Sequence, residues 1–113
     1  DVHVVLSNAD QHLLGAEIAL ADAGYNVEDL YLMGGGAAEV AIEAIRAGQW
    51  DATFIGVPLS EGYLAAKAVI AALNGEEVNP IIDITKPEIV GIDPIITKDV
   101  LDANPNWQPE WGG

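Results

Sequence analysis

Few side chains in this sequence are of the types that perform covalent or metal chemistry. The chain has two histidines, His3 and His12, and no cysteine. A zinc or iron site needs three or more converging ligands, and Asp10 with His12 supplies at most two. The sequence has no G-x-S-x-G elbow, and Ser7 and Ser60 are expected in turn and helix-cap positions. We therefore predict no catalytic residue, metal ligand or cofactor, and we expect a protein that is not an enzyme.

Two short segments are better suited to contacting a ligand. Asn8, Ala9 and Asp10 follow the first expected strand, and a glycine run at 34–36 lies between the second strand and a helix. In open α/β sheets ligands bind at the carboxyl ends of the strands, where both segments are expected. Asp10 is also predicted to cap the helix that follows, and a cap at this edge is compatible with ligand contact.

The glycine run at 34–36 permits close approach to the backbone, but its surroundings do not suit a phosphate. A dinucleotide fingerprint starting at Gly34 would need glycine where Glu39 stands, and no Lys-Ser/Thr pair follows for a Walker loop. Glu39 also places a negative charge at the start of the helix, where a phosphate would bind. A neutral ligand lying against the glycines is favoured, and the alternative is a tight turn that needs a positive φ.

An alternating pattern of strands and helices positions these segments. The pattern predicts strands at 2–6, 29–33 and 51–57 and helices at 11–23, 37–47 and 60–73. Strands joined by helices form a parallel sheet with right-handed crossovers. The expected fold class is therefore α/β, with a parallel sheet flanked by helices as in Rossmann-like and flavodoxin-like domains.

The C-terminal third has a different character. Residues 79–94 contain three prolines and are expected to be extended, before a strand at 95–97, a short helix at 98–103 and a tail at 104–113. Trp107 and Trp111 in this tail are expected to dock on the chain itself, with partner contact as the alternative. Trp50 is expected to cover the corner between the second helix and the third strand.

The charge balance excludes several classes of partner. Among 113 residues, 18 carboxylates oppose four Lys and Arg, which gives a formal net charge of −14. Nucleic acids and anionic membranes bind basic surfaces, so neither is expected as a partner. No apolar run reaches the roughly 18 residues that span a bilayer. The absence of cysteine is consistent with an exported protein.

Four segments together resemble one family. They are SNADQHLLGA at 7–16, EAIRAGQWDAT at 43–53, the Gly-Tyr-Leu-Ala to Leu-Asn-Gly-Glu-Glu element at 62–77, and IITKDV at 95–100. Their order and spacing are similar to those of the type I periplasmic sugar-binding proteins, which are ribose-binding-like solute receptors of ABC importers.

The resemblance implies a two-lobed, periplasmic or extracellular receptor, with a lipid anchor as an option, that closes on a sugar or polyol and delivers it to a permease. This chain would be its C-terminal part, in keeping with the strand pattern that starts at Asp1. Residues 1–57 would form a βαβαβ unit of the C-terminal lobe, 58–92 a hinge crossing and a helix of the N-terminal lobe, and 93–113 the return strand, short helix and tail. The helix at 60–73 would pack on its own sheet, on the missing lobe or on another chain.

The resemblance also implies where a solute would bind. The family's Asn before the matched Asp10 falls on Ala9, with Asn8 one step earlier; its Asp after the second strand falls on Gly36, and its amide after the third strand falls on Gly56. The expected ligand-binding residues are therefore Asn8, Ala9, Asp10, Gly35, Gly36 and Gly56. The solute would be smaller or less polar than a hexose held in the usual way, or backbone groups and the other lobe would hold it.

Two further classes remain as alternatives. The effector domain of a LacI-type repressor shares the fold, and a DNA-binding helix-turn-helix upstream would favour it. A flavodoxin-like enzyme or a receiver domain is the other. A receiver needs an acidic cluster with a Lys at a strand end, and the sequence offers no such Lys.

Overall fold

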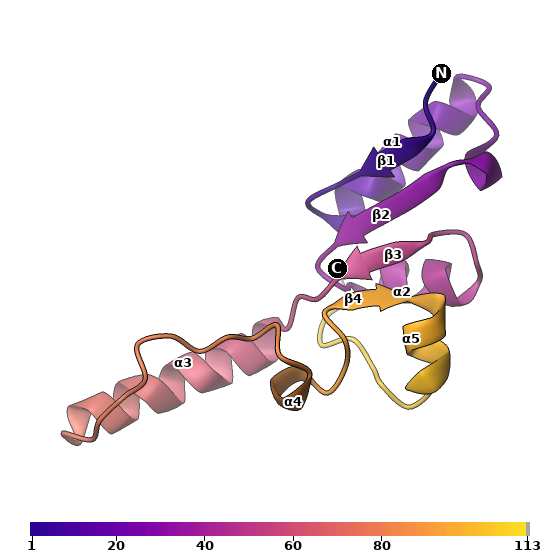
Figure 1. Cartoon of the computed structure of the whole chain (residues 1–113). Helices are drawn as coiled ribbons and strands as arrows, with labels where there is room; N and C mark the ends of the chain where they lie inside the picture. The colour runs from indigo at the N-terminus through magenta and orange to yellow at the C-terminus, as the bar shows by residue number, and fades with distance from the viewer. Residues whose placement is uncertain (113) are drawn as a thin grey trace.

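A four-stranded sheet organises the computed structural model, which describes residues 1–112 (Figure 1). Its strands are β1 (Val4–Leu6), β2 (Tyr31–Gly35), β3 (Ala52–Phe54) and β4 (Ile95–Thr97), in that spatial order. The first three run parallel, and β4 pairs antiparallel with β3. The predicted α/β fold with a mainly parallel sheet is confirmed.

Helices α1 (Asp10–Asp22) and α2 (Glu39–Arg46) lie on the same face of this sheet (Figure 1). Right-handed crossovers between strands in the order β1-β2-β3 place both helices on one side. The core forms between this face and the helices, and its fully buried large side chains are Leu13, Leu32, Ile42, Ile45 and Ile96. Helix α5 (Lys98–Ala103) adds Leu101 to the same core.

The opposite face of the sheet is open in the described chain. The strand register aligns Val4 with Tyr31 and Phe54 with Ile95. All four side chains are more than one third exposed, as is Leu6. Side chains alternate between the two faces of a strand. This half of the sheet therefore presents apolar side chains to solvent.

Helix α3 (Pro58–Leu73) projects away from the sheet, and the segment that follows it runs back along its length (Figure 1). We call residues 58–86 the arm, and residues 1–57 with 87–112 the body. Within the described chain α3 has no buried residue, and its large exposed side chains are Leu59, Tyr63, Val69, Ile70 and Leu73. Of the three alternatives for this helix, packing back on its own sheet does not occur in the described chain.

The arm gives the chain an elongated shape. The radius of gyration is 16.9 Å and the longest dimension is 60 Å. A compact domain of this length would have a radius of gyration of about 13 Å. None of the helices formed by residues 1–112 is both long and apolar enough to cross a membrane.

Several elements differ from the predictions. The third strand ends at Phe54, before the predicted 57, and the segment 79–94, predicted to be extended, contains the short helix α4 (Pro87–Val90). Two further differences have local reasons. The second strand starts at Tyr31 because Val27–Asp29 forms a single 3-10 turn, η1. Helix α3 starts at Pro58, whose fixed φ suits the first turn of a helix. Ser60 therefore lies inside the first turn, and the prediction that it caps the helix is wrong.

Two tryptophans close the body as predicted. Trp50 is buried at the α2–β3 corner, where its Nε1 donates to Glu17 Oε2 at 2.8 Å. Trp107 packs against the core, and its Nε1 donates to the carbonyl of Val90, the last residue of α4 (Pro87–Val90), at 3.3 Å. Arg46 donates to the Trp107 carbonyl at 3.0 Å, so the tail docks on its own chain.

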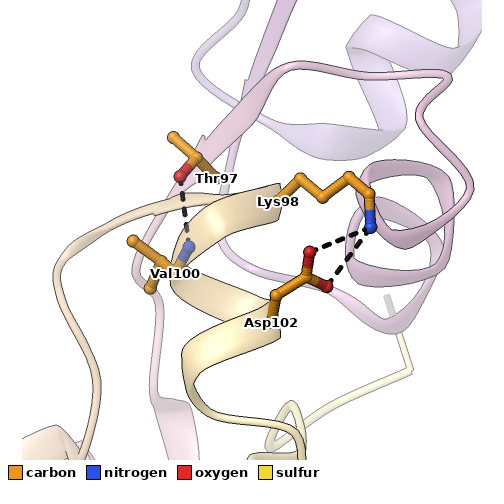
Figure 2. Close-up of polar contacts among 4 residues, drawn as sticks. All are labelled: Thr97, Lys98, Val100 and Asp102. Carbon is orange, nitrogen blue, oxygen red and sulfur yellow. Dashed lines mark hydrogen bonds and ion pairs between the residues drawn. The ribbon is translucent and has the colours of Figure 1, made fainter.

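Helix α5 shows how a short helix is held locally (Figure 2). The Thr97 hydroxyl accepts from the Val100 N–H at 3.4 Å and so caps the helix. Lys98 and Asp102 form an i,i+4 ion pair at 3.2 Å, with both side chains more than half exposed.

Candidate functional site

Asp10 is fully buried at the carboxyl end of β1. Its Oδ2 accepts from the Ala38 N–H at 2.8 Å, and its Oδ1 accepts from the Thr53 hydroxyl at 2.8 Å. It is the first residue of α1 and makes no bond to that helix's own free N–H groups; Ala9 stands at the cap position, without a side-chain bond. The prediction that Asp10 caps α1 is wrong.

The Asp10 carboxylate instead accepts a hydrogen bond at the start of α2. Ala38 is the residue that precedes α2, and a negative charge at a helix N-terminus is stabilising. A buried carboxylate must be paired by donors, and Asp10 has one on α2 and one on β3. Both oxygens are thus used within the chain, so Asp10 fixes the relative positions of three elements at this edge.

The glycines at the strand ends are needed for close packing. A Cβ on Gly34 would lie 2.2 Å from Asp10 Oδ1, and one on Gly35 would lie 2.0 Å from the Phe54 ring. A Cβ on Gly56 would lie 2.6 Å from the Gly36 carbonyl oxygen. Gly36 has φ of +117°, so the alternative interpretation, a tight turn that needs a positive φ, describes this residue.

The tail covers the glycine turn. Trp111 Nε1 donates to the Gly36 carbonyl at 2.8 Å, and the Trp111 carbonyl accepts from the Glu39 N–H at 3.2 Å. A Cβ on Gly36 would meet the indole ring at 2.9 Å. The Trp111 indole therefore covers one side of this turn, and Gly36 stays partly exposed.

A cavity of about 230 Å³ lies beside this indole. Its walls are Gly56, Val57, Pro58, Glu61 and Trp111, from the segment after β3, the first turn of α3 and the tail. The walls are mainly apolar, with one carboxylate from Glu61. No Lys or Arg stands among these lining residues of the described chain, so the cavity favours solutes without negative charge.

The predicted site residues divide into two groups. Asp10, Gly35, Gly36 and Gly56 come together at the strand ends, and only Gly56 lines the cavity. Asn8 is exposed in the β1–α1 loop, where its Oδ1 lies 3.3 Å from His12 Nδ1. Ala9 is half-buried beside it, and its carbonyl accepts from the Ser7 hydroxyl. Contact of any of these residues with a solute stays a prediction.

Sequence reasoning missed Trp111, Pro58 and Glu61 as residues of this edge. The Trp-Gln-Pro-Glu-Trp segment did indicate docking, but no local pattern indicates a partner 75 residues away at Gly36. Nothing in the sequence distinguishes Glu61 from the other acidic residues of the chain. Its place in the cavity wall follows only from the start of α3 at Pro58, which puts Glu61 in the first turn of the helix.

Electrostatics elsewhere gives no second site. Residues 1–112 contain no group of three His, Cys, Asp or Glu side chains that could hold a metal ion. In the arm, hydrogen bonds from the Thr85 hydroxyl and N–H lower the pKa of Asp83 below its ordinary value, and Lys86 adds to this. Asp83 is solvent-exposed, so this shift reflects a local turn.

Comparison with known proteins assigns this fold to a family. The model of the periplasmic binding protein domain family matches residues 1–77, more than half of the chain. The chain belongs to the periplasmic binding protein domain family. Comparisons with curated proteins and with solved structures gave no match.

Membership of the periplasmic binding protein domain family supports a general role. Proteins of this family bind small-molecule solutes, usually in the periplasm, take part in ABC transport and are generally not catalytic.

Proposed function

We propose that this chain is the C-terminal part of the solute receptor of an ABC importer, and that it binds a sugar or polyol between two lobes. The observation that carries the proposal is the cavity beside Trp111, at the strand ends of a periplasmic binding protein domain. The resemblance of four ordered segments to sugar-binding receptors supports the choice of solute.

The chemistry of the cavity supports a neutral solute with an apolar face. An indole ring and a proline ring offer surfaces on which the C–H face of a sugar packs. Glu61, one of the lining residues, carries a carboxylate that can accept hydrogen bonds from hydroxyl groups. At about 230 Å³ the cavity is smaller than the 300–1,000 Å³ or so of typical ligand pockets, so a second surface has to complete it.

The division of the chain follows from the same proposal. Residues 1–57 belong to one lobe, 58–92 carry the chain across a hinge and supply a helix to the other lobe, and 93–113 return. The exposed arm supports this division. The chain exposes 6,962 Å², about 1,000 Å² more than a compact monomer of its mass, and one side of a standard interface buries about 800 Å².

The occupant proposed for the arm is the other lobe of the receptor, on the same polypeptide or on another chain. The further proposed partner is the permease of an ABC importer. The proposed location is the periplasm or the cell exterior, with a lipid anchor as an option.

A solute screen tests the proposal. The parent polypeptide, translated from the whole reading frame, is screened by thermal shift with pentoses, hexoses, polyols and small non-sugar solutes. We expect a rise in melting temperature with at least one sugar or polyol and none with sugar phosphates. No shift with any of them would contradict the proposal.

Variants of the parent then test the site itself. Trp111→Leu should weaken binding of the responding solute at least tenfold, whereas Tyr25→Leu, at an exposed aromatic outside the cavity lining, should leave it unchanged.

The upstream sequence tests the alternative function, because a helix-turn-helix there would favour a LacI-type repressor over a receptor.

A further inference from the structure

Within residues 1–112 helix α3 joins the body at its first turn, and Ile84 of the segment that returns along the helix also packs against the core. Val57, the residue before the helix, is buried, whereas no residue of the helix is buried in the described chain. A 16-residue helix is about 24 Å long. A small change of angle at its first turn therefore moves its far end by several ångströms.

That first turn receives a cap from the far end of the sequence. The first N–H groups of a helix have no intrahelical acceptor, and Val57 offers no side-chain cap. The Glu110 carboxylate accepts from the Ser60 N–H at 2.8 Å and also from the Ser60 hydroxyl. Its negative charge lies at the positive end of the helix dipole.

Trp111, the residue after Glu110, bonds the tail to the β2–α2 turn at the same edge of the sheet. Trp111 bonds the Gly36 carbonyl through its indole and the Glu39 N–H through its carbonyl. Trp111 also shares the cavity wall with Pro58. Two consecutive tail residues thus bond α3 on one side and the β2–α2 turn on the other.

We propose that Glu110 and Trp111 form a clasp that sets the direction in which α3 leaves the sheet. They are positioning residues: they act on the angle between the body and whatever surface packs on the arm. This inference goes beyond the proposed function, because the clasp would work in this way whether or not a solute binds at this edge.

Distance measurement between spin labels tests the clasp in the full 113-residue chain. The sequence has no cysteine, so Glu43→Cys on α2 and Ala72→Cys at the far end of α3, both exposed, can be labelled selectively. Electron–electron double resonance on this labelled pair should give a narrow distance distribution. Adding Glu110→Ala with Trp111→Leu should at least double its width.

Matched controls separate the clasp from general loosening. Glu28→Ala removes an exposed carboxylate far from the tail and should leave the width unchanged. Trp111→Phe keeps an aromatic ring but loses the bond to Gly36, and should give an intermediate width. Dilution with unlabelled chain removes distances between molecules.

Amide hydrogen exchange supplies a second readout. In the Glu110→Ala, Trp111→Leu chain, exchange at Ser60 should speed up at least tenfold, whereas exchange in β2 and β3 should not change. The clasp is overturned if the double variant keeps the narrow distribution, if the unmodified chain is already as broad as the variant, or if Ser60 exchanges equally fast in both.

Discussion

The body and the arm contain similar apolar side chains but use them differently. In α2 the buried residues Ala41, Ile42, Ala44 and Ile45 form one stripe that faces the sheet, and charged residues occupy the other side. In α3 apolar residues occur all round the helix, with Glu61 and Lys67 as its only charges, and none is buried in the described chain. A helix that is apolar on every side is typical of one packed between other elements.

This difference shows that the body buries a hydrophobic core of its own, whereas α3 buries no residue within the described chain. The body closes its core with α1, α2 and α5, and its buried carboxylate is fully paired. The arm and the open face of the sheet both expose apolar surface. The proposed second lobe would cover part of this apolar surface.

The largest expected effect separates the two regions directly. Ile45→Ala removes a fully buried side chain and should lower the free energy of unfolding by about 2–5 kcal/mol. Ile70→Ala, the same substitution at a 60% exposed position in the arm, should change it by less than about 0.5 kcal/mol. Urea unfolding of both variants measures the contrast, and equal losses would show that the arm packs in solution.

The next effect concerns the polar edge of the body. Asp10→Asn removes the charge that two donors share and should lower the free energy of unfolding by about 2 kcal/mol, because hydrogen bonds to charged groups are worth about 1.5–3 kcal/mol. Asp22→Asn, at an exposed position of the same helix, is the matched control and should have almost no effect. Similar losses for the two would mean that Asp10 does not hold the strand ends together.

The smallest effects lie at α5, where a cap and a surface ion pair can be compared. Thr97→Ala should cost about 1 kcal/mol through the lost cap. Lys98→Ala should cost about 0.3–0.5 kcal/mol, and this loss should vanish in high salt because the pair is exposed. Urea unfolding at low and high salt checks both, and a loss from Lys98→Ala that persists in high salt would contradict this ranking.

Local patterns in the sequence were sufficient for most elements. Periodicity and turn residues predicted the alternation of strands and helices, the end of α3 at Leu73, and the short strand and helix after Pro94. Each of these depends on residues close together in the chain. The start of β2 was misplaced by two residues because Asp29 belongs to the turn at Val27–Asp29 and Leu30 ends that turn.

The site was less predictable, because its contacts join distant residues. Asp10 was expected to act on its own helix, but its partners lie 28 and 43 residues away. A capping residue and a residue that bridges to another helix look alike in sequence. The role of Glu110 likewise depends on a turn 50 residues earlier.

The most direct test of the account is calorimetric titration of the responding sugar or polyol into two proteins, the parent polypeptide and this 113-residue chain. The account predicts binding by the parent and weak or no binding by the chain alone, because the proposed second lobe would supply half of the site. Tight binding by the isolated chain, or no binding by the parent, would contradict it.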